Sequence, residues 1–211
     1  MKKSKLFCGL LMGLSLSACA TVDTASRNAP PEPMHVAQIA PSVRIAEYSV
    51  QVPRSLRVSE ANRYYPGGDI VWRGDPAGDR YEQVKAIFET SLARSAQAVQ
   101  GERPVRVDIV VKRFHAMTEK ARYTVGGIHA ITFDMTVRDP ETGAVLVPQR
   151  TVRADLEGLG GSRALAAEAR GVTQKYRITN HLVGVIEQEL TDPQGYQATE
   201  MGLMQAINRI R

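Results

Sequence analysis

The thiol of Cys19 is the side chain whose sequence neighbours point most clearly to a chemical role. Three lysines lie near the start of the chain, an apolar run extends from Leu6 to Leu16, and small residues come just before the cysteine. This order is typical of a secretory signal. The apolar run is too short to cross a bilayer, which takes about 20 residues. Residues 1–18 are therefore predicted to be a signal peptide that is removed from the mature chain.

Leu16-Ser17-Ala18-Cys19 resembles the lipobox of bacterial lipoproteins. The resemblance implies that the Cys19 thiol receives a diacylglyceryl group, that the chain is cut before Cys19, and that the new amine is acylated. The alternative is an ordinary signal peptide, with Cys19 a spare thiol. Several acyl chains would hold the protein on a membrane, its predicted partner. Because Ala20 rather than aspartate follows Cys19, the periplasmic face of the outer membrane is favoured.

Loss of the signal also changes the composition of the chain. Cys8 would leave with it and Cys19 would carry lipid, so no thiol would remain to form a disulfide. Lys2, Lys3 and Lys5 would leave as well, which lowers the net charge from +5 to +2. A nucleic-acid partner is therefore not expected.

The remaining chain divides into three predicted parts. Residues 19–41 are rich in alanine and proline, with little apolar periodicity, and are predicted to be the lipidated cysteine and a flexible tether. Residues 42–192 are long enough for one domain with a core. Residues 193–211 are predicted to be a C-terminal helix or tail. Thr199 could cap such a helix, whose apolar stripe would dock on the domain or on a partner.

Apolar periodicity predicts the elements of the domain. Strict alternation favours strands over 43–52 and 104–116, and a short strand lies near 69–73. In the first strand, the side chains predicted to share one face are those of Ala46, Tyr48, Val50 and Val52. Steps of three and four residues predict a helix that begins near Asp79, in a capping box with Glu82, and is stopped by Gly101 and Pro104.

Two more strands and a second helix follow. The two strands are joined by a turn over 139–143, in which Pro140 presets φ and Gly143 accepts a positive φ. One long helix is predicted after the glycines at 158–161, ending at Asp192. The order strand-helix-strand-strand-strand-helix predicts an α+β fold. It would have an antiparallel sheet of about four strands with both helices packed on one face.

The segment Gly126-Gly127-Ile128-His129, followed by the Asp139–Gly143 hairpin, resembles uncharacterised alphaproteobacterial lipoproteins. With the lipobox and the order of elements, the chain is also more distantly similar to auxiliary lipoproteins of ABC-type transport systems and to the lipopolysaccharide-assembly lipoprotein. The resemblance implies a fold and a location in the cell envelope. It supplies no catalytic residues.

Signals for catalysis are weak. The Gly-x-Ser-x-Gly elbow, the P-loop lysine and the full dinucleotide fingerprint are absent from the sequence. Gly160-Gly161-Ser162 opens a helix whose amides could bind an anion, but Ser162 as a simple helix cap is favoured. No catalytic residue and no cofactor is therefore predicted.

Two of the four histidines are candidate metal ligands. His115 and His129 would come close if their strands pair, and two imidazoles could hold a transition metal. A closed zinc site needs four ligands, however, and no third histidine or cysteine joins them. We therefore expect no metal site. His181 is assigned to the polar face of the second helix and His35 to the tether.

Tyr64, Tyr65 and Trp72 gather three of the few aromatic residues in one irregular stretch. They form either a contact patch for a partner or a lid folded over the edge of the sheet. The charged strand face with Arg106, Asp108 and Lys112 is interpreted as a solvated face.

Three functions remain open. The leading one is a non-catalytic accessory lipoprotein that is anchored to a membrane and binds an envelope protein or lipid. The alternatives are a metal-dependent or hydrolytic enzyme that acts on envelope polymers, and a structural lipoprotein without a ligand.

Overall fold

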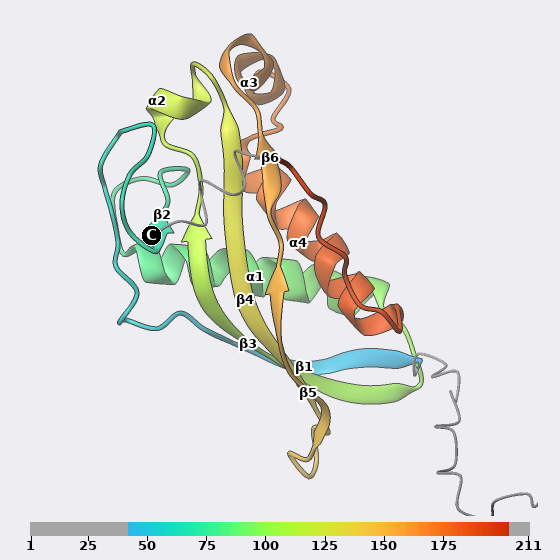
Figure 1. The fold of residues 1–211 in the computed structure, drawn as a ribbon. Helices are drawn as coiled ribbons and strands as arrows, with labels where there is room; N and C mark the ends of the chain where they lie inside the picture. Colours follow the sequence, from blue (N-terminus) through green and yellow to red (C-terminus); the bar gives the residue numbers. More distant parts are fainter. Residues whose placement is uncertain (1–41, 203–211) are drawn as a thin grey trace, which may run out of the picture. The chain divides into compact units, whose positions relative to one another are not determined.

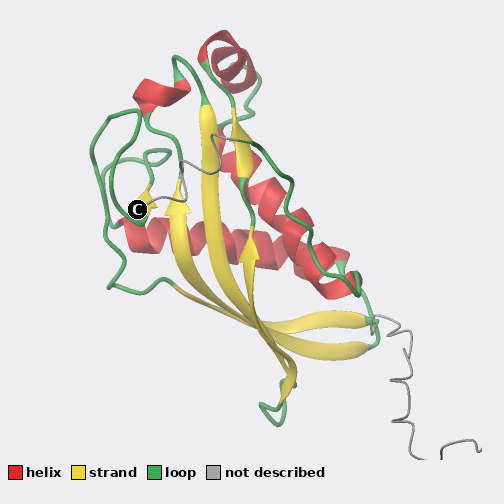
Figure 2. Cartoon of the chain, in the orientation of Figure 1, coloured by secondary structure: helices red, strands yellow, loops and turns green. Residues whose placement is uncertain are grey.

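The computed structural model describes residues 42–202, which form an α+β domain with a six-stranded sheet (Figures 1 and 2). Its elements in chain order are β1 (Val43–Gln51), β2 (Ile70–Val71), α1 (Arg80–Ala98), β3 (Arg103–His115), α2 (Glu119–Arg122), β4 (Gly127–Arg138), β5 (Val145–Arg153), β6 (Leu156–Gly158), α3 (Gly161–Glu168) and α4 (Gln174–Thr191). The predicted signal, Cys19 and the tether lie outside the described residues, as do positions 203–211. In the part that is described, no helix has both the length and the apolar character needed to span a membrane.

The long strands β3 and β4 form the middle of the sheet. On one side β1 and β2 lie end to end along β3, and on the other β5 and β6 lie end to end along β4. The pairs β3/β4, β4/β5 and β4/β6 are antiparallel, but β1 and β2 run parallel to β3. The sheet is therefore mixed, and the expectation of a purely antiparallel sheet is wrong. The helix α1 supplies the crossover that a parallel β1/β3 pair requires.

The core lies between the sheet and the helices α1 and α4, which pack against each other on one face (Figure 1). Phe88 of α1 makes edge contacts with Phe114 of β3 and Phe133 of β4, at centroid distances of 6.2 and 5.3 Å. The helix α4 buries Ile178, Leu182, Val185 and Ile186. Burial of these large apolar side chains is the main stabilising contribution to the fold.

The periodicity of the first helix and of two strands is confirmed. Asp79 caps α1 by accepting hydrogen bonds from the amides of Tyr81 and Glu82, at 2.9 and 3.3 Å. In β3, alternate residues from Val105 to Val111 are buried. The β4/β5 hairpin turns at 139–143, where Gly143 has a φ of +72°.

The assignment of faces in β1 is only partly right. Val43, Ile45 and Val50 are buried, whereas Ala46 is exposed. The register with β3 shifts between Ile45 and Glu47, so that Ala46 is the extra residue of a bulge. A bulge moves the alternation by one position, and strict period-two counting does not anticipate it.

The second predicted helix is two helices. The chain leaves α3 and turns at Gly171, with a φ of +77°, and Thr173 then caps α4 by accepting a hydrogen bond from the Tyr176 amide at 3.2 Å. The predicted apolar stripe runs across this break, and two of its members, Leu165 and Tyr176, are exposed. The short α2, which sequence periodicity did not indicate, brings the number of described helices to four.

The C-terminal segment is described only as far as Gly202. Residues 193–202 are irregular, so no helix begins at Thr199. The rest of the predicted apolar stripe lies outside the described residues.

Candidate functional site

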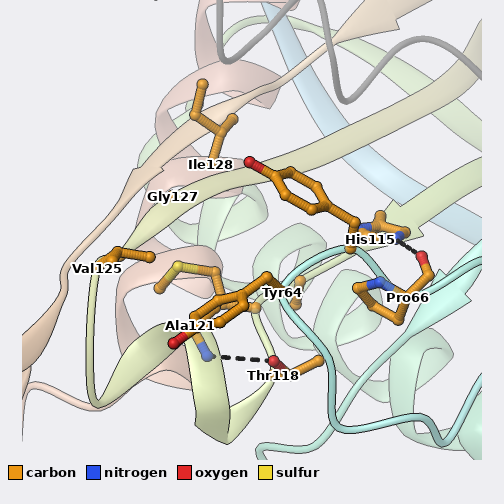
Figure 3. Close-up of a pocket in the computed structure, with 12 residues that line it drawn as sticks. Tyr64, Pro66, His115, Thr118, Ala121, Val125, Gly127 and Ile128 are labelled. Atoms are coloured by element: carbon orange, nitrogen blue, oxygen red, sulfur yellow. Dashed lines mark hydrogen bonds between the residues drawn. The ribbon is translucent and has the colours of Figure 1, made fainter.

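An apolar pocket of about 260 Å³ opens where the loop with Tyr64 and Tyr65 meets the end of β3 and the start of β4 (Figure 3). Its lining includes Met117, Ala121, Val125 and Ile128, together with the two tyrosines. Tyr65 is 60% exposed and Val125 75% exposed, so the rim carries large apolar side chains in contact with solvent. Such an arrangement is typical of a site that binds an apolar group.

Hydrogen bonds hold the tyrosine loop against the body of the domain. The Thr118 hydroxyl donates to the Arg63 carbonyl, and the Lys120 amide donates to the Asn62 side chain, both at 2.8 Å. His115 Nε2 donates to the Pro66 carbonyl at 2.8 Å (Figure 3). The rim of the pocket is thus fixed on both sides of Tyr64 and Tyr65.

Thr118 has a second role at the same place. Its hydroxyl oxygen accepts a hydrogen bond from the Ala121 amide at 3.3 Å, which caps α2 (Figure 3). The Lys120 ammonium lies 4.8 Å from the centre of the Tyr64 ring, within the range of a cation–π contact. The short helix α2 is therefore the support on which the loop rests.

A buried arginine fixes the outer part of the same loop. Arg80, at the start of α1, donates to both carboxylate oxygens of Glu60, at 2.7 and 3.1 Å, and to the carbonyls of Asp75 and Pro76. The hydrogen bond from Arg80 lowers the pKa of Glu60 below its usual value, which keeps that carboxylate charged. Arg73 adds contacts to Glu60 and Glu119.

Trp72 does not take part in this surface. It is fully buried, packs edge-on against Phe114 at 5.6 Å, and donates from Nε1 to Asp75 at 2.8 Å. The grouping of Trp72 with the two tyrosines as one contact patch is therefore corrected. Tyr64 and Tyr65 line the pocket, whereas Trp72 belongs to the core beneath.

The two candidate metal ligands lie on opposite faces of the sheet. His115 is paired with Ala130, the neighbour of His129, and neighbouring residues of a strand point to opposite sides. His115 therefore lines the pocket, whereas His129 is buried on the side of the helices. No group of three histidine, cysteine or acidic side chains able to hold a metal occurs in residues 42–202.

Burial also sets the charge of the histidines. Burial lowers the pKa of His115, with a smaller opposing effect from its bond to Pro66. His181 is half-buried, with its ring edge-on to Tyr196 at 6.0 Å, and its pKa is lowered mainly by burial. The assignment of His181 to a polar helix face is therefore wrong, and these rings favour the neutral form at neutral pH.

The glycine-rich starts of β4 and α3 lie against each other. A Cβ on Gly160 would lie 2.2 Å from the Gly126 nitrogen, so this approach of two backbones requires glycine. Gly160 is the N-cap of α3 and Ser162 does not cap the helix, contrary to the sequence interpretation.

The charged side chains on the open face of β3 form hydrogen bonds with one another. Asp108 accepts hydrogen bonds from Arg106, Arg138 and Ser49, as expected for a solvated face.

Sequence patterns did not identify Met117, Thr118, Ala121 or Val125 as lining residues. They lie in and around a four-residue helix, which is too short for a periodic signal. The Gly126-Gly127 pair does mark this part of the pocket in the sequence. Gly126 has a φ of +76°, and the chain turns there into β4 at the pocket wall.

The chain is similar to solved structures of low sequence identity and to one protein family. A crystal structure of a Xanthomonas campestris protein, described as family DUF330, is similar at a TM-score of 0.42 and 16% identity, over 72% of this chain and 85% of that one. A crystal structure described as a "putative lipoprotein" from Caulobacter crescentus CB15 is similar at a TM-score of 0.33 and 12% identity, over 67% and 87%. No curated protein matches the sequence. Residues 43–206 match the family described as "Family of unknown function (DUF6778)", and the chain belongs to that family.

Proposed function

We propose that this protein is a non-catalytic accessory lipoprotein of the bacterial envelope, held on the periplasmic face of the outer membrane through Cys19. The domain binds an envelope component through the pocket beneath Tyr64 and Tyr65. The lipobox-like sequence supports the anchor, and the pocket supports the binding role.

The observation that carries the binding role is an apolar pocket with a fixed rim. Exposed tyrosines in a hydrogen-bonded loop bind with little loss of conformational entropy, because their positions are already set. The pocket-lining residues are mostly apolar, and the one histidine among them donates its Nε2 proton to a backbone carbonyl. These features favour binding of an apolar group over acid–base chemistry.

Site-specific photocrosslinking in the intact envelope tests this function. Benzoylphenylalanine in place of Tyr65 is expected to give one recurring adduct, identified by mass spectrometry as a particular envelope protein or lipid. The matched control has the same group in place of Tyr176 of α4, which is 50% exposed but is not a lining residue of the pocket. Equal adducts from both positions, or none from position 65, would contradict the proposal.

A further inference from the structure

A second, much smaller cavity shares the side chain of Met117 with the apolar pocket. Its volume is about 10 Å³, which is room for about one water molecule. Its lining includes polar side chains from α2, β4, α3 and α4, namely Arg122, His129, Glu168, Gln174 and Arg177.

Several polar atoms of this cavity have no hydrogen-bond partner among the described residues. His129 is fully buried, and neither ring nitrogen is paired. Gln174 is 5% exposed, and neither its amide nitrogen nor its amide oxygen is paired. The Nε atom of Arg122 is also unpaired. Native proteins rarely leave buried polar atoms in this state, so their convergence on one cavity indicates that a ligand group completes them.

The charge of the cavity favours an anionic group. It has two guanidinium groups and one carboxylate, and that carboxylate, Glu168, is already paired with Arg122 at 3.3 Å. Arg177 is half-buried, and burial lowers its pKa more than the attraction of Glu157 raises it. Gln174 is the first residue of α4, where the helix dipole adds partial positive charge. A single negative charge would balance this set.

Met117 separates the two cavities. It is 6% exposed and contributes to the lining of both the apolar pocket and the polar cavity. Its thioether lies directly over Gly158, where an added Cβ would be 2.4 Å from Sδ. Methionine has three rotatable side-chain bonds and adapts readily to a new neighbour. Met117 is therefore the side chain at which the pocket and the cavity adjoin.

We propose that the two cavities are the two ends of one ligand site, which takes an amphipathic molecule with an alkyl body and a carboxylate head. The alkyl body occupies the apolar pocket, Met117 moves aside, and the head is bound by Arg177, Gln174 and His129. A planar carboxylate matches the paired donors of a guanidinium. A fatty acid is the simplest ligand of this class. The inference rests on the proposed function of the pocket and names its ligand.

Binding of decanoate and decan-1-ol by isothermal titration calorimetry tests the inference. The chain from residue 19 to 211 is used with Cys19→Ser, so that no attached lipid competes. We expect decanoate to bind at least tenfold more tightly than decan-1-ol, because only the carboxylate pairs with Arg177. Arg177→Gln should remove most of this difference while decan-1-ol affinity stays the same.

Arg163→Gln is the matched control, because Arg163 is 65% exposed and is not a lining residue of the polar cavity. It should keep the preference for decanoate. Equal affinities for the acid and the alcohol in the chain with Arg163 and Arg177 intact would overturn the inference, whether or not the variants fold. The same holds if Arg163→Gln removes the preference as fully as Arg177→Gln. In either case a recurring adduct at position 65 would leave the proposed function standing, whereas its absence would remove both.

Discussion

Lys175 at the start of α4 donates a hydrogen bond of 2.8 Å to Asp75 in the loop before α1. The two residues are 100 positions apart, and the other oxygen of Asp75 accepts the 2.8 Å hydrogen bond from Trp72. One carboxylate thus joins the second long helix, the loop and the core tryptophan.

Replacing Asp75 tests this junction. Asp75→Ala leaves the indole N–H without its acceptor and should lower the free energy of unfolding by about 1–3 kcal/mol. Asp75→Asn keeps an acceptor for Trp72 and should cost less. Urea denaturation followed by circular dichroism gives both values, and equal losses in the two variants would show that the hydrogen bond to Trp72 contributes nothing.

Trp72 itself should be critical for stability rather than for binding. Trp72→Ala removes a fully buried side chain and should cost about 3–5 kcal/mol of unfolding free energy. Trp72→Phe keeps the packing against Phe114 and should cost less. As the only tryptophan of the chain, it also reports its own burial through fluorescence. An emission maximum typical of an indole in water would contradict this placement.

Thr118 should stabilise the rim of the pocket through its hydroxyl. Thr118→Ala removes both the cap of α2 and the bond to the Arg63 carbonyl, with an expected loss of about 1–2 kcal/mol. Thr118→Ser keeps the hydroxyl and is the control. Faster amide hydrogen exchange across residues 62–66 in the alanine variant alone would support the assigned contacts, and unchanged exchange would not.

His129 should make the fold sensitive to acid. Burial lowers its pKa from 6.5 to about 3, so the unfolded chain takes up a proton between these values and the folded chain does not. His129 alone therefore lowers the free energy of unfolding by up to about 1.4 kcal/mol per pH unit as the pH drops below 6.5, and His115 and His181 add to this slope. His129→Leu should reduce the total slope by this contribution and leave that of His115 and His181. An unchanged slope would mean that His129 is not held neutral.

Cys19 should be required for anchoring. Cys19→Ser cannot form the thioether and should give unprocessed or soluble protein, whereas Cys8→Ser should behave like the unaltered chain. Metabolic labelling with radioactive palmitate separates these outcomes. Absence of label in the unaltered protein, or equal label in Cys19→Ser, would contradict the lipoprotein proposal.

Local patterns predicted the elements well where one short segment contains the whole signal. The cap at Asp79 and the turn at Gly143 depend on residues within a few positions, and both are found as expected. The parallel pairing of β1 with β3 could not be predicted in this way, because the period of two is the same in parallel and antiparallel strands. The break at Gly171 was hidden by apolar residues that continue on both sides of it.

The pocket and the cavity were harder to anticipate from sequence. The Tyr64-Tyr65 pair drew attention to the right loop, but the burial of Trp72 depends on its distant neighbours Phe114 and Asp75. Likewise, Met117, Gln174 and Arg177 are unremarkable in sequence and meet only because α4 packs near the end of β4. Sequence-local arguments have no access to such non-local contacts.

The parallel placement of β1 also has a kinetic consequence. Strands β3, β4 and β5 follow one another closely and can pair by closing short loops, whereas β1 must wait for α1 and for β3, about 60 residues later in the chain. The first strand to be synthesised is therefore expected to wait longest for its partner. During that interval its backbone edge and its apolar face are exposed, so a nascent chain is most prone to aggregate before residue 110 has been added and β3 is complete enough to receive it.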